Sequence, residues 1–211
     1  MNTDIIVIGA GGHAKVCIEL LRSMGERVAF CVGAPGSPDR CLDVPVLNGD
    51  DNLATLHQKG YSRAFVAIGS NGIRDRLARL AVDQEYGLVN AISPHAVISP
   101  TAELGTGIAV MAGAVINASA LIGDLAIINT GATIDHDCRI GRGVHIAPRC
   151  ALSGNVRVGD HSFLGAGCTV IDGIRIGEGV TVGAGGVVIS DIGPKATAVG
   201  VPARVVGDPI K

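Results

Sequence analysis

Aromatic residues are scarce in this sequence. Phe, Tyr and Trp together make up 2% of its 211 residues, and Trp is absent altogether. Glycine, in contrast, occurs 31 times. A core with few rings, many small aliphatic side chains and much glycine is narrow and tightly turned. We therefore expect no broad β-sandwich.

The sequence also lacks a basic patch and an uninterrupted apolar run. Its net charge of −2 and its pI of about 6.3 disfavour nucleic acid as a partner. The uncharged stretch 105–123 contains four Gly besides Asn, Thr and Ser, so we interpret it as core and expect no membrane span. The N-terminus, MNTDIIVIGAGG, has an acidic residue and glycines where a signal peptide needs a basic and then an apolar region. These features predict a cytoplasmic protein.

No Cys-x-x-Cys pair occurs, although the chain has six cysteines. This spacing argues against zinc-binding and redox motifs. Because cytoplasmic thiols stay reduced, we expect the cysteines to be buried core residues. They are Cys17, Cys31, Cys41, Cys138, Cys150 and Cys168.

A six-residue repeat dominates the second half of the sequence. Stepping by six from Ile92 to Val188 gives seventeen positions, each of them Ile, Leu or Val. The fourth residue after each position is mostly small or aliphatic, and Gly often follows the position directly. This period indicates short strands that each end in a turn. We predict that both repeated positions point inward, that the Gly relieves the backbone at the corner, and that the coils stack as a parallel β-helix.

This repeat resembles that of the hexapeptide-repeat acyltransferases, whose chains wind left-handed into three-sided prisms. The resemblance implies coils of eighteen residues, and so between five and six coils over residues 92–190. It also implies a homotrimer with active sites in the clefts between neighbouring prisms.

The first 90 residues have a different pattern. Apolar runs at 4–9, 27–32 and 63–69 predict strands, with helical segments between them. This alternation predicts a small parallel, Rossmann-like α/β sheet. We therefore expect two domains, a Rossmann-like domain over residues 1–90 and a left-handed β-helix with a C-terminal cap over residues 91–211. The glycine-rich turn at residues 9–14 makes the first of them the candidate nucleotide-sugar-binding domain.

A glycine-rich turn follows the first predicted strand. Residues 9–14, GAGGHA, match G-x-G-x-x-[GA] before a helix, where backbone N–H groups can hold phosphate. Gly11, Gly12 and His13 are therefore candidate ligands. Residues 31–33, CVG, stand where a dinucleotide site needs an acid, which disfavours a redox cofactor. Two interpretations of this turn stay open. It binds the phosphate of a nucleotide or nucleotide sugar, or it is a structural turn that binds no ligand.

Two further polar residues follow the strand predicted at 63–69. Asn71 and Arg74 lie at the carboxyl end of that strand, the edge at which open α/β sheets bind ligands. Arg74 can there reach a phosphate, or it is a solvated charge on the next helix.

One histidine interrupts the repeat. His136 stands between Asp135 and Asp137 and fits neither inward position, so we expect it outside the prism near a corner. Acidic neighbours can set the tautomer of an imidazole and raise its basicity. A base that titrates near neutral pH is what acyl transfer to an amine or a hydroxyl needs. A surface histidine with no chemical role is the alternative.

Four motifs together resemble a narrower family. They are GAGGHAK at 9–15, IDHDC at 134–138, SGNV at 153–156 and GVPAR at 200–204. The set resembles the bacterial acetyltransferases of nucleotide-linked amino sugars, which include the bacillosamine and perosamine N-acetyltransferases, and covers nearly the whole chain. The resemblance implies metal-free acetyl transfer from acetyl-CoA to the amino group of a UDP- or GDP-linked 4-amino-4,6-dideoxy sugar.

The same resemblance implies roles for single residues. His136 would be the general base, assisted by Asp137. The bacillosamine enzymes have the longer Glu at the position of Asp137. Asp135 could therefore share the role of assisting His136. The N–H of Gly154 would stabilise the oxyanion. Acetyl-CoA would contact His145, Gly154, Ala166, Ala184 and Arg204.

The identity of the nucleotide stays open. The bacillosamine enzymes have acids after the second strand, where this chain has Val32 and Gly33. This difference puts uridine recognition in doubt and leaves a guanosine-linked sugar, such as GDP-perosamine, open.

Three rival functions are compatible with the sequence. The first is O-acetylation of a sugar, as in the sialic-acid O-acetyltransferase branch of the family. The second is a zinc hydratase on the same prism, which needs three histidine ligands meeting across a subunit boundary. The third is a non-catalytic nucleotide-binding trimer, which leaves the acidic surroundings of the central histidine unexplained. The histidines available for zinc are His95, His136, His145 and His161.

Overall fold

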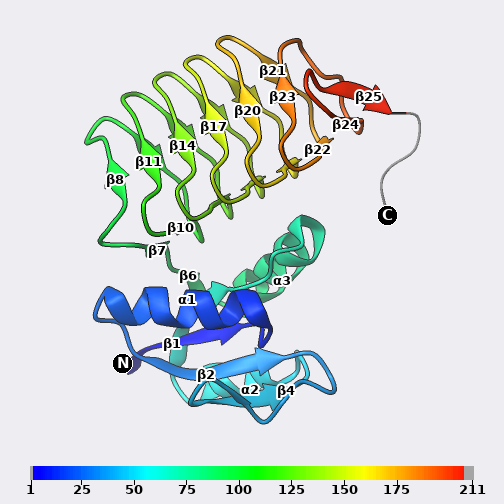
Figure 1. Cartoon of the computed structure of the whole chain (residues 1–211). Helices are drawn as coiled ribbons and strands as arrows, with labels where there is room; N and C mark the ends of the chain where they lie inside the picture. The colour runs from blue at the N-terminus through cyan, green and yellow to red at the C-terminus, as the bar shows by residue number, and fades with distance from the viewer. Residues whose placement is uncertain (1, 207–211) are drawn as a thin grey trace. The chain divides into compact units, whose positions relative to one another are not determined.

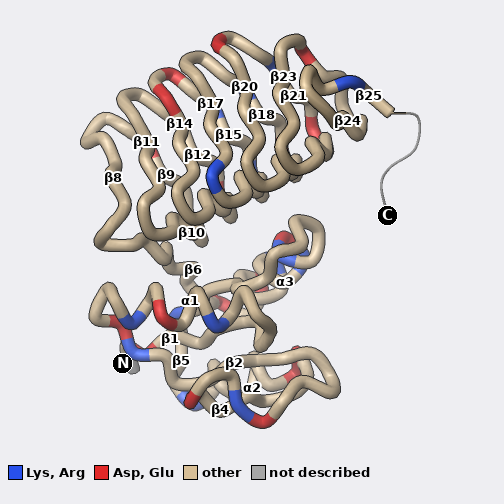
Figure 2. Tube along the Cα trace, in the orientation of Figure 1, with Lys and Arg blue, Asp and Glu red and all other residues tan. Residues whose placement is uncertain are grey.

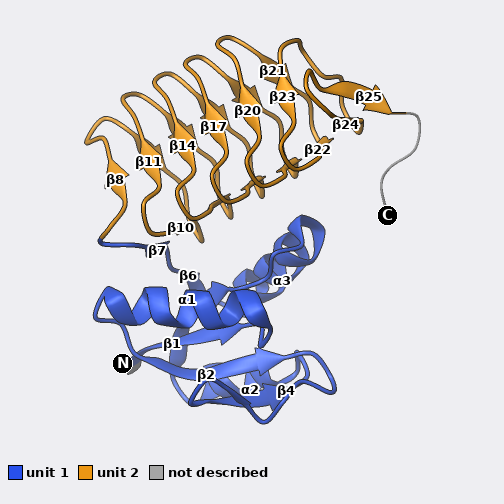
Figure 3. Ribbon diagram, in the orientation of Figure 1, with its two compact units in different colours: residues 1–94 blue, residues 95–211 orange. Residues whose placement is uncertain are grey.

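The computed structural model describes residues 2–206. It divides into two compact units, one up to residue 94 and the other from residue 95 onward (Figure 3). No helix within residues 2–206 is long and apolar enough to cross a membrane. All six cysteines are buried and have free thiols, which confirms the prediction of core thiols.

The first unit is built on a six-stranded sheet of order β3-β4-β2-β1-β5-β6 (Figure 1). Its neighbouring strands are parallel except for the antiparallel pair β3–β4. The central strand β1 is buried from Ile5 to Ile8, as expected of an apolar run with parallel neighbours on both sides. This arrangement confirms the predicted Rossmann-like sheet. The elements are β1 (Asn2–Ile8), α1 (Gly12–Ser23), β2 (Val28–Gly33), β3 (Arg40–Cys41), β4 (Val44–Asn48), α2 (Asn52–Gln58), β5 (Tyr61–Val66), α3 (Asn71–Asp83), β6 (Gly87–Leu88) and β7 (Ala91–Ile92).

The second unit is a left-handed parallel β-helix, as predicted. From β8 to β23 its strands are two residues long and pair with strands eighteen residues away, as Val115 does with Thr133. The last two strands, β24 and β25, are three residues long and form an antiparallel pair. Three sheets result, which we name the β14 sheet (β8-β11-β14-β17-β20-β23), the β15 sheet (β9-β12-β15-β18-β21) and the β16 sheet (β10-β13-β16-β19-β22-β24-β25).

The strands of the β14 sheet are β8 (Val97–Ile98), β11 (Val115–Ile116), β14 (Thr133–Ile134), β17 (Ala151–Leu152), β20 (Thr169–Val170) and β23 (Val187–Val188). Those of the β15 sheet are β9 (Glu103–Leu104), β12 (Leu121–Ile122), β15 (Arg139–Ile140), β18 (Arg157–Val158) and β21 (Arg175–Ile176). Those of the β16 sheet are β10 (Ala109–Val110), β13 (Ile127–Ile128), β16 (His145–Ile146), β19 (Phe163–Leu164), β22 (Thr181–Val182), β24 (Thr197–Val199) and β25 (Arg204–Val206).

Both repeated positions line the interior of the prism. Every aliphatic position from Val110 to Val188 is buried, and so is the residue four places after each of them. The pattern arises because the last residue of each strand and the last residue of each turn point to the same side. The inward-facing positions of the repeat are therefore confirmed.

The turns take their shape from the third residue after each aliphatic position. This residue has a positive φ in fourteen successive repeats. Eight of the fourteen residues are Gly, and two others are Asp137 and Asn155, types that enter the left-handed region more readily than most residues do. The positions are Gly107, Gly113, Ser119, Leu125, Gly131, Asp137, Gly143, Arg149, Asn155, His161, Gly167, Gly173, Gly179 and Gly185.

This finding corrects the expected role of the Gly that directly follows each aliphatic position. A Cβ at Gly123 would lie 2.8 Å from the backbone nitrogen of Arg142 in the next coil. A Cβ at Gly159 would lie 2.5 Å from the backbone nitrogen of Glu178. These glycines therefore allow close stacking of the coils, and the reversal of the chain occurs two residues later.

Candidate active site

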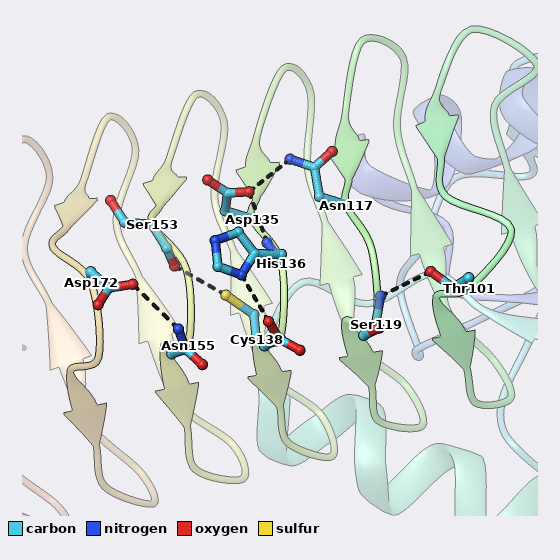
Figure 4. A network of polar contacts seen from close by, with 10 residues as sticks. Thr101, Asn117, Ser119, Asp135, His136, Cys138, Ser153, Asn155 and Asp172 are labelled. Atoms are coloured by element: carbon cyan, nitrogen blue, oxygen red, sulfur yellow. Dashed lines mark hydrogen bonds and ion pairs between the residues drawn. The ribbon is translucent and has the colours of Figure 1, made fainter.

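His136 lies in the turn that directly follows β14. Its side chain is 53% exposed and that of Asp137 is 56% exposed, so the pair faces outward from the prism as expected. Figure 4 shows the ring of His136 between the side chains of neighbouring turns. Asp137 is the turn residue with the left-handed conformation, at φ +59°. Figure 2 shows acidic residues at this turn. The geometry of the turn thus presents the imidazole at an edge of the prism.

The two aspartates beside His136 have different partners. Oδ2 of Asp137 lies 2.8 Å from Nδ1 of His136. Oδ1 of Asp135 instead accepts a hydrogen bond from the backbone N–H of His136 at 2.8 Å and another from Nδ2 of Asn117 at 3.0 Å. Asp137 therefore orients the imidazole, and Asp135 supports the turn that carries it.

These contacts alter the titration of the site. The hydrogen bond that His136 Nδ1 donates to Asp137 is the largest effect and raises the pKa of His136, while desolvation opposes it. The negative charges of Asp135, Asp137 and Asp172 raise the pKa further. The backbone hydrogen bond from His136, followed by the one from Asn117, lowers the pKa of Asp135. The site thus holds a basic imidazole beside an ionised carboxylate.

His136, Gly154 and Asp172 are stacked in three successive coils. A Cβ at Gly154 would lie 2.6 Å from Cε1 and 2.7 Å from Nε2 of His136, and 2.9 Å from Oδ1 of Asp172. Nε2 therefore lies above the Gly154 backbone, on the side of Asp172. Within residues 2–206 the N–H of Gly154 donates to no acceptor. The imidazole therefore covers the Gly154 backbone, and the unpaired N–H of Gly154 lies in the coil next to the ring.

Asp172 is missing from the residues expected to form the site. It follows His136 by two coils of eighteen residues, the spacing that the strand register shows. That spacing was present in the repeat and would have identified it. Nδ2 of Asn155 lies 3.5 Å from its Oδ1, and Sγ of Cys138 donates to the carbonyl oxygen of Ser153 at 3.1 Å (Figure 4). These contacts connect neighbouring turns of the same edge.

A groove runs beside this edge over the outer face of the β14 sheet. Its volume is about 280 Å³. Asn117 and Asp135 form its polar side. The other lining residues are Val115, Thr133, Ala151, Leu152 and Ser153.

The residues expected to contact acetyl-CoA lie on two edges of the prism. Gly154 is on the catalytic edge, which we define as the turns after the β14-sheet strands (residues 135–138, 153–156 and 171–174). Ala166 and Ala184 are exposed on a second edge, which we name the alanine edge, in the turns after β19 and β22. The structure thus brings Gly154 to His136 and places the two alanines on a different edge of the same chain.

His145 and Arg204 lie apart from the catalytic edge. His145 is on β16, where its Nε2 lies 3.1 Å from Nδ2 of Asn129 and its ring packs edge-on against Phe163 at 5.2 Å between centroids. Arg204 is exposed on β25, and its Nη1 donates to the carbonyl oxygen of Ala203 at 3.1 Å. Their predicted contacts with CoA stay predictions.

The glycine-rich turn of the first unit is open. Gly11 and Gly12 are exposed at the start of α1, and a Cβ at either would meet no atom within 4 Å. No side chain caps this helix end. Burial, followed by the charge of Arg74, lowers the pKa of His13. The open N–H groups at this turn suit a phosphate.

Arg74 is neither solvated nor on the surface of α3. It is 1% exposed, and its guanidinium donates to the carbonyl oxygens of Ile68 and Gly69, both at 3.0 Å, and to Oδ1 of Asn71 at 2.9 Å. Burial lowers its pKa to about 10. The solvated alternative is therefore wrong, and the side chain organises the loop between β5 and α3. Direct contact with a phosphate stays a prediction.

The histidines considered for zinc lie on different strands and turns of the chain. His145 lies on β16, while His161 is the left-handed residue of the turn before β19. Among the described residues, no three His, Cys, Asp or Glu side chains are grouped so that they could hold a metal ion.

Comparison with known proteins gives matches to both units. Residues 4–80 match the model of the PglD N-terminal domain, and residues 155–190 match that of the hexapeptide repeat of succinyl-transferase. Perosamine N-acetyltransferase from Caulobacter crescentus, solved as a histidine-to-asparagine variant in complex with CoA and GDP-perosamine, is 53% identical, with a TM-score of 0.95 and 97% of each chain covered.

A second similar structure is the acetyltransferase domain of PglB from Neisseria gonorrhoeae in complex with acetyl coenzyme A. It is 37% identical, with a TM-score of 0.91, and the match covers 98% of this chain and 100% of that one. The two structures share both units with the present chain. The chain therefore belongs to the hexapeptide-repeat nucleotide-sugar acetyltransferases with a PglD-type N-terminal domain.

Proposed function

We propose that this protein transfers the acetyl group of acetyl-CoA to the amino group of a GDP-linked 4-amino-4,6-dideoxy sugar such as GDP-perosamine. The observation that carries the proposal is the imidazole of His136, held at Nδ1 by Asp137 at 2.8 Å with Nε2 directed over Gly154. The relative from Caulobacter crescentus, which is 53% identical, holds CoA and GDP-perosamine.

The chemistry follows from the atoms at this edge. The sugar nitrogen attacks the thioester carbonyl carbon, and Nε2 of His136 accepts the proton that the nitrogen loses. Asp137 stabilises the resulting imidazolium through Nδ1. The N–H of Gly154 donates to the oxyanion of the tetrahedral intermediate. The C–S bond then breaks, and the imidazolium returns the proton to the departing CoA thiolate.

The first unit would hold the nucleotide. The N–H groups at Gly11 and Gly12 are open to a diphosphate, and His13 adds a ring beside them. Val32 and Gly33 at the end of β2 offer no carboxylate to a uracil or ribose. This absence favours guanosine over uridine. Arg74 would act by fixing the loop that begins α3.

We also propose that the protein works as a homotrimer in the cytoplasm. The catalytic edge and the alanine edge border opposite sides of the β14 sheet, so a CoA that contacts both is best accommodated between two copies of the chain. Acetyl-CoA and nucleotide sugars are cytoplasmic metabolites. Light scattering on the purified chain tests the trimer, and a monomer with full activity would contradict it.

A thiol-release assay tests the reaction. The purified protein is given acetyl-CoA with GDP-perosamine or with a UDP-linked 4-amino sugar. We expect release of CoA with the GDP-linked amine, and a loss of about 10² to 10⁴-fold in kcat when His136 is replaced by Ala. No release with any amino sugar would contradict the proposal.

Treatment of the product with mild base separates the main alternative. An amide survives such treatment and an ester does not. Recovery of free acetate from the product would establish O-acetylation of the sialic-acid type. Tight nucleotide binding without acetyl transfer would instead support the non-catalytic trimer.

A further inference from the structure

Three arginines lie in register on the outer face of the β15 sheet. Arg139 of β15 pairs with Arg157 of β18, which pairs with Arg175 of β21. Each precedes a buried aliphatic residue, so its side chain points away from the prism. Neighbouring strands are about 4.8 Å apart. Three guanidinium groups can therefore reach a single ligand.

Within residues 2–206, no acidic side chain forms an ion pair with any of these three arginines, and none of their side chains forms a hydrogen bond. Among the acids of the neighbouring turns, Asp124 accepts from the N–H of Thr106 and pairs with Arg142. Like charges directly opposite one another destabilise a sheet. The stability of the prism alone does not explain this arrangement.

A groove with a volume of about 580 Å³ lies over the same face. The three arginines line most of its length, and Glu103 and Leu121 line one end. Exposed cationic side chains along a groove of this size suit an extended anion. A guanidinium binds phosphate through paired hydrogen bonds.

The arginines stand at the side of the groove nearest the catalytic edge, because Arg139 and Arg157 directly follow the turns 135–138 and 153–156. The other side of the groove extends into the turns that follow the β15-sheet strands, at Gly123, Gly141 and Gly159. Arg139 follows His136 by three residues, and Arg157 follows Gly154 by three residues. The arginines thus extend from the coil of His136 through the two coils beyond it. A ligand with its reactive group at His136 and its negative charges some distance away would match this layout.

We propose that Arg139, Arg157 and Arg175 form an arginine ladder that binds the 3′-phosphate and the diphosphate of acetyl-CoA. This assignment rests on the proposed function. The flexible pantetheine arm separates the thioester of acetyl-CoA from its phosphate groups, so the thioester can lie at His136 while the phosphates lie on the ladder. The diphosphate of the nucleotide sugar is the other phosphate source, and the test distinguishes the two.

The experiment measures binding to the full chain by titration calorimetry, with CoA, 3′-dephospho-CoA and GDP as the probes. The variants are Arg157→Gln, Arg175→Gln and the triple Gln variant. Arg27→Gln is the matched control, since it removes the same charge from a side chain that is 81% exposed in the first unit. Thermal melting confirms folding, and we expect the triple variant to melt at or above the wild-type temperature.

We expect each single variant to raise the Kd of CoA about 10-fold and the triple variant about 100-fold or more. The Kd of GDP should stay constant, and the control should match wild type. Wild type should bind 3′-dephospho-CoA more weakly than CoA. The ratio between the Kd values of these two ligands should be smaller in the triple variant than in wild type. In turnover assays the KM for acetyl-CoA should rise while kcat at saturation changes less than about twofold.

Two outcomes would overturn the assignment. Wild-type affinity for CoA in the triple variant would show that the ladder does not bind it. A loss of affinity confined to GDP would assign the ladder to the nucleotide sugar. Because CoA binding is measured without turnover, both outcomes are distinct from a failure of the proposed acetyl transfer.

Discussion

Nδ1 of His136 and Oδ2 of Asp137 lie 2.8 Å apart although the two residues are adjacent in sequence. Asp137 adopts φ +59° at the third position of its turn, which turns its carboxylate back toward the preceding ring. The local conformation that closes each turn of the prism therefore also brings His136 together with the carboxylate that orients it. Asp135, on the other side of the histidine, instead accepts hydrogen bonds from the backbone N–H of His136 and from the side-chain amide of Asn117.

Replacing Asp137 by Asn tests this division of roles. The variant keeps a side chain of similar shape and removes the charge that, with its hydrogen bond, raises the pKa of His136. The base is active when deprotonated, so the acid limb of the kcat/KM profile should move to lower pH. We expect kcat to fall by less than the 10² to 10⁴-fold expected for loss of the base itself. An unchanged pH profile would contradict the role of Asp137.

Gly154→Ala should impair catalysis without unfolding the prism. The added Cβ would lie 2.6 Å from Cε1 and 2.7 Å from Nε2 of His136, so the ring must move away from the Gly154 N–H that we propose as the oxyanion donor. We expect kcat to fall by about 10²-fold, as for a misplaced catalytic group. Gly193→Ala is the control, because a Cβ there meets no atom within 4 Å. Steady-state kinetics measure kcat for both variants, and their melting temperatures show whether each is folded. Equal kcat values in the two variants would refute the prediction.

Asp172→Asn should act through charge alone. The negative charge of Asp172 raises the pKa of His136 less than the charges of Asp135 and Asp137 do. We expect the acid limb of kcat/KM to shift to lower pH by less than in Asp137→Asn, with kcat at high pH nearly unchanged. Asp83→Asn on α3 is the control. A shift larger than that of Asp137→Asn would show that Asp172 has a direct role with the substrate.

Arg74→Met should destabilise the first unit. The substitution leaves the carbonyl oxygens of Ile68 and Gly69 without the guanidinium that now donates to both at 3.0 Å. We expect a loss on the order of 2–4 kcal/mol in the free energy of unfolding. Denaturant unfolding measures this loss, and Arg79→Met, on the exposed side of α3, should lose less than about 1 kcal/mol. Equal losses would contradict the structural role of Arg74.

The ion pair between Glu26 and Arg63 should make stability depend on pH. Nη2 of Arg63 lies 2.7 Å from Oε1 of Glu26, and the side-chain hydrogen bond from Arg63 lowers the pKa of Glu26. A depressed carboxyl pKa contributes stability above the pKa of the unfolded state, and this contribution is lost as the pH falls through the folded-state value. Arg63→Met should therefore lower the melting temperature more at pH 7 than at pH 3. An equal loss at both values would exclude the pair as the cause.

Much of the fold was predictable because it is repetitive. The aliphatic residues from Ile92 to Val188 recur without a slip, and each strand pairs with the strand one coil away. A regular period of six leaves few ways to bury the same face in every repeat. His136 was also predictable as an outward residue, since it falls outside both buried positions.

The sequence by itself determined the two units, the wound prism and the outward histidine, because these depend on local pattern and period. Only the tertiary structure decided that Asp137 holds the ring, that Gly154 and Asp172 stack with it, and that Arg74 is buried beneath its loop. Those relationships depend on the φ of one turn residue and on which side chains successive coils bring together. Residues eighteen or thirty-six positions apart become neighbours only when the coils have closed in register.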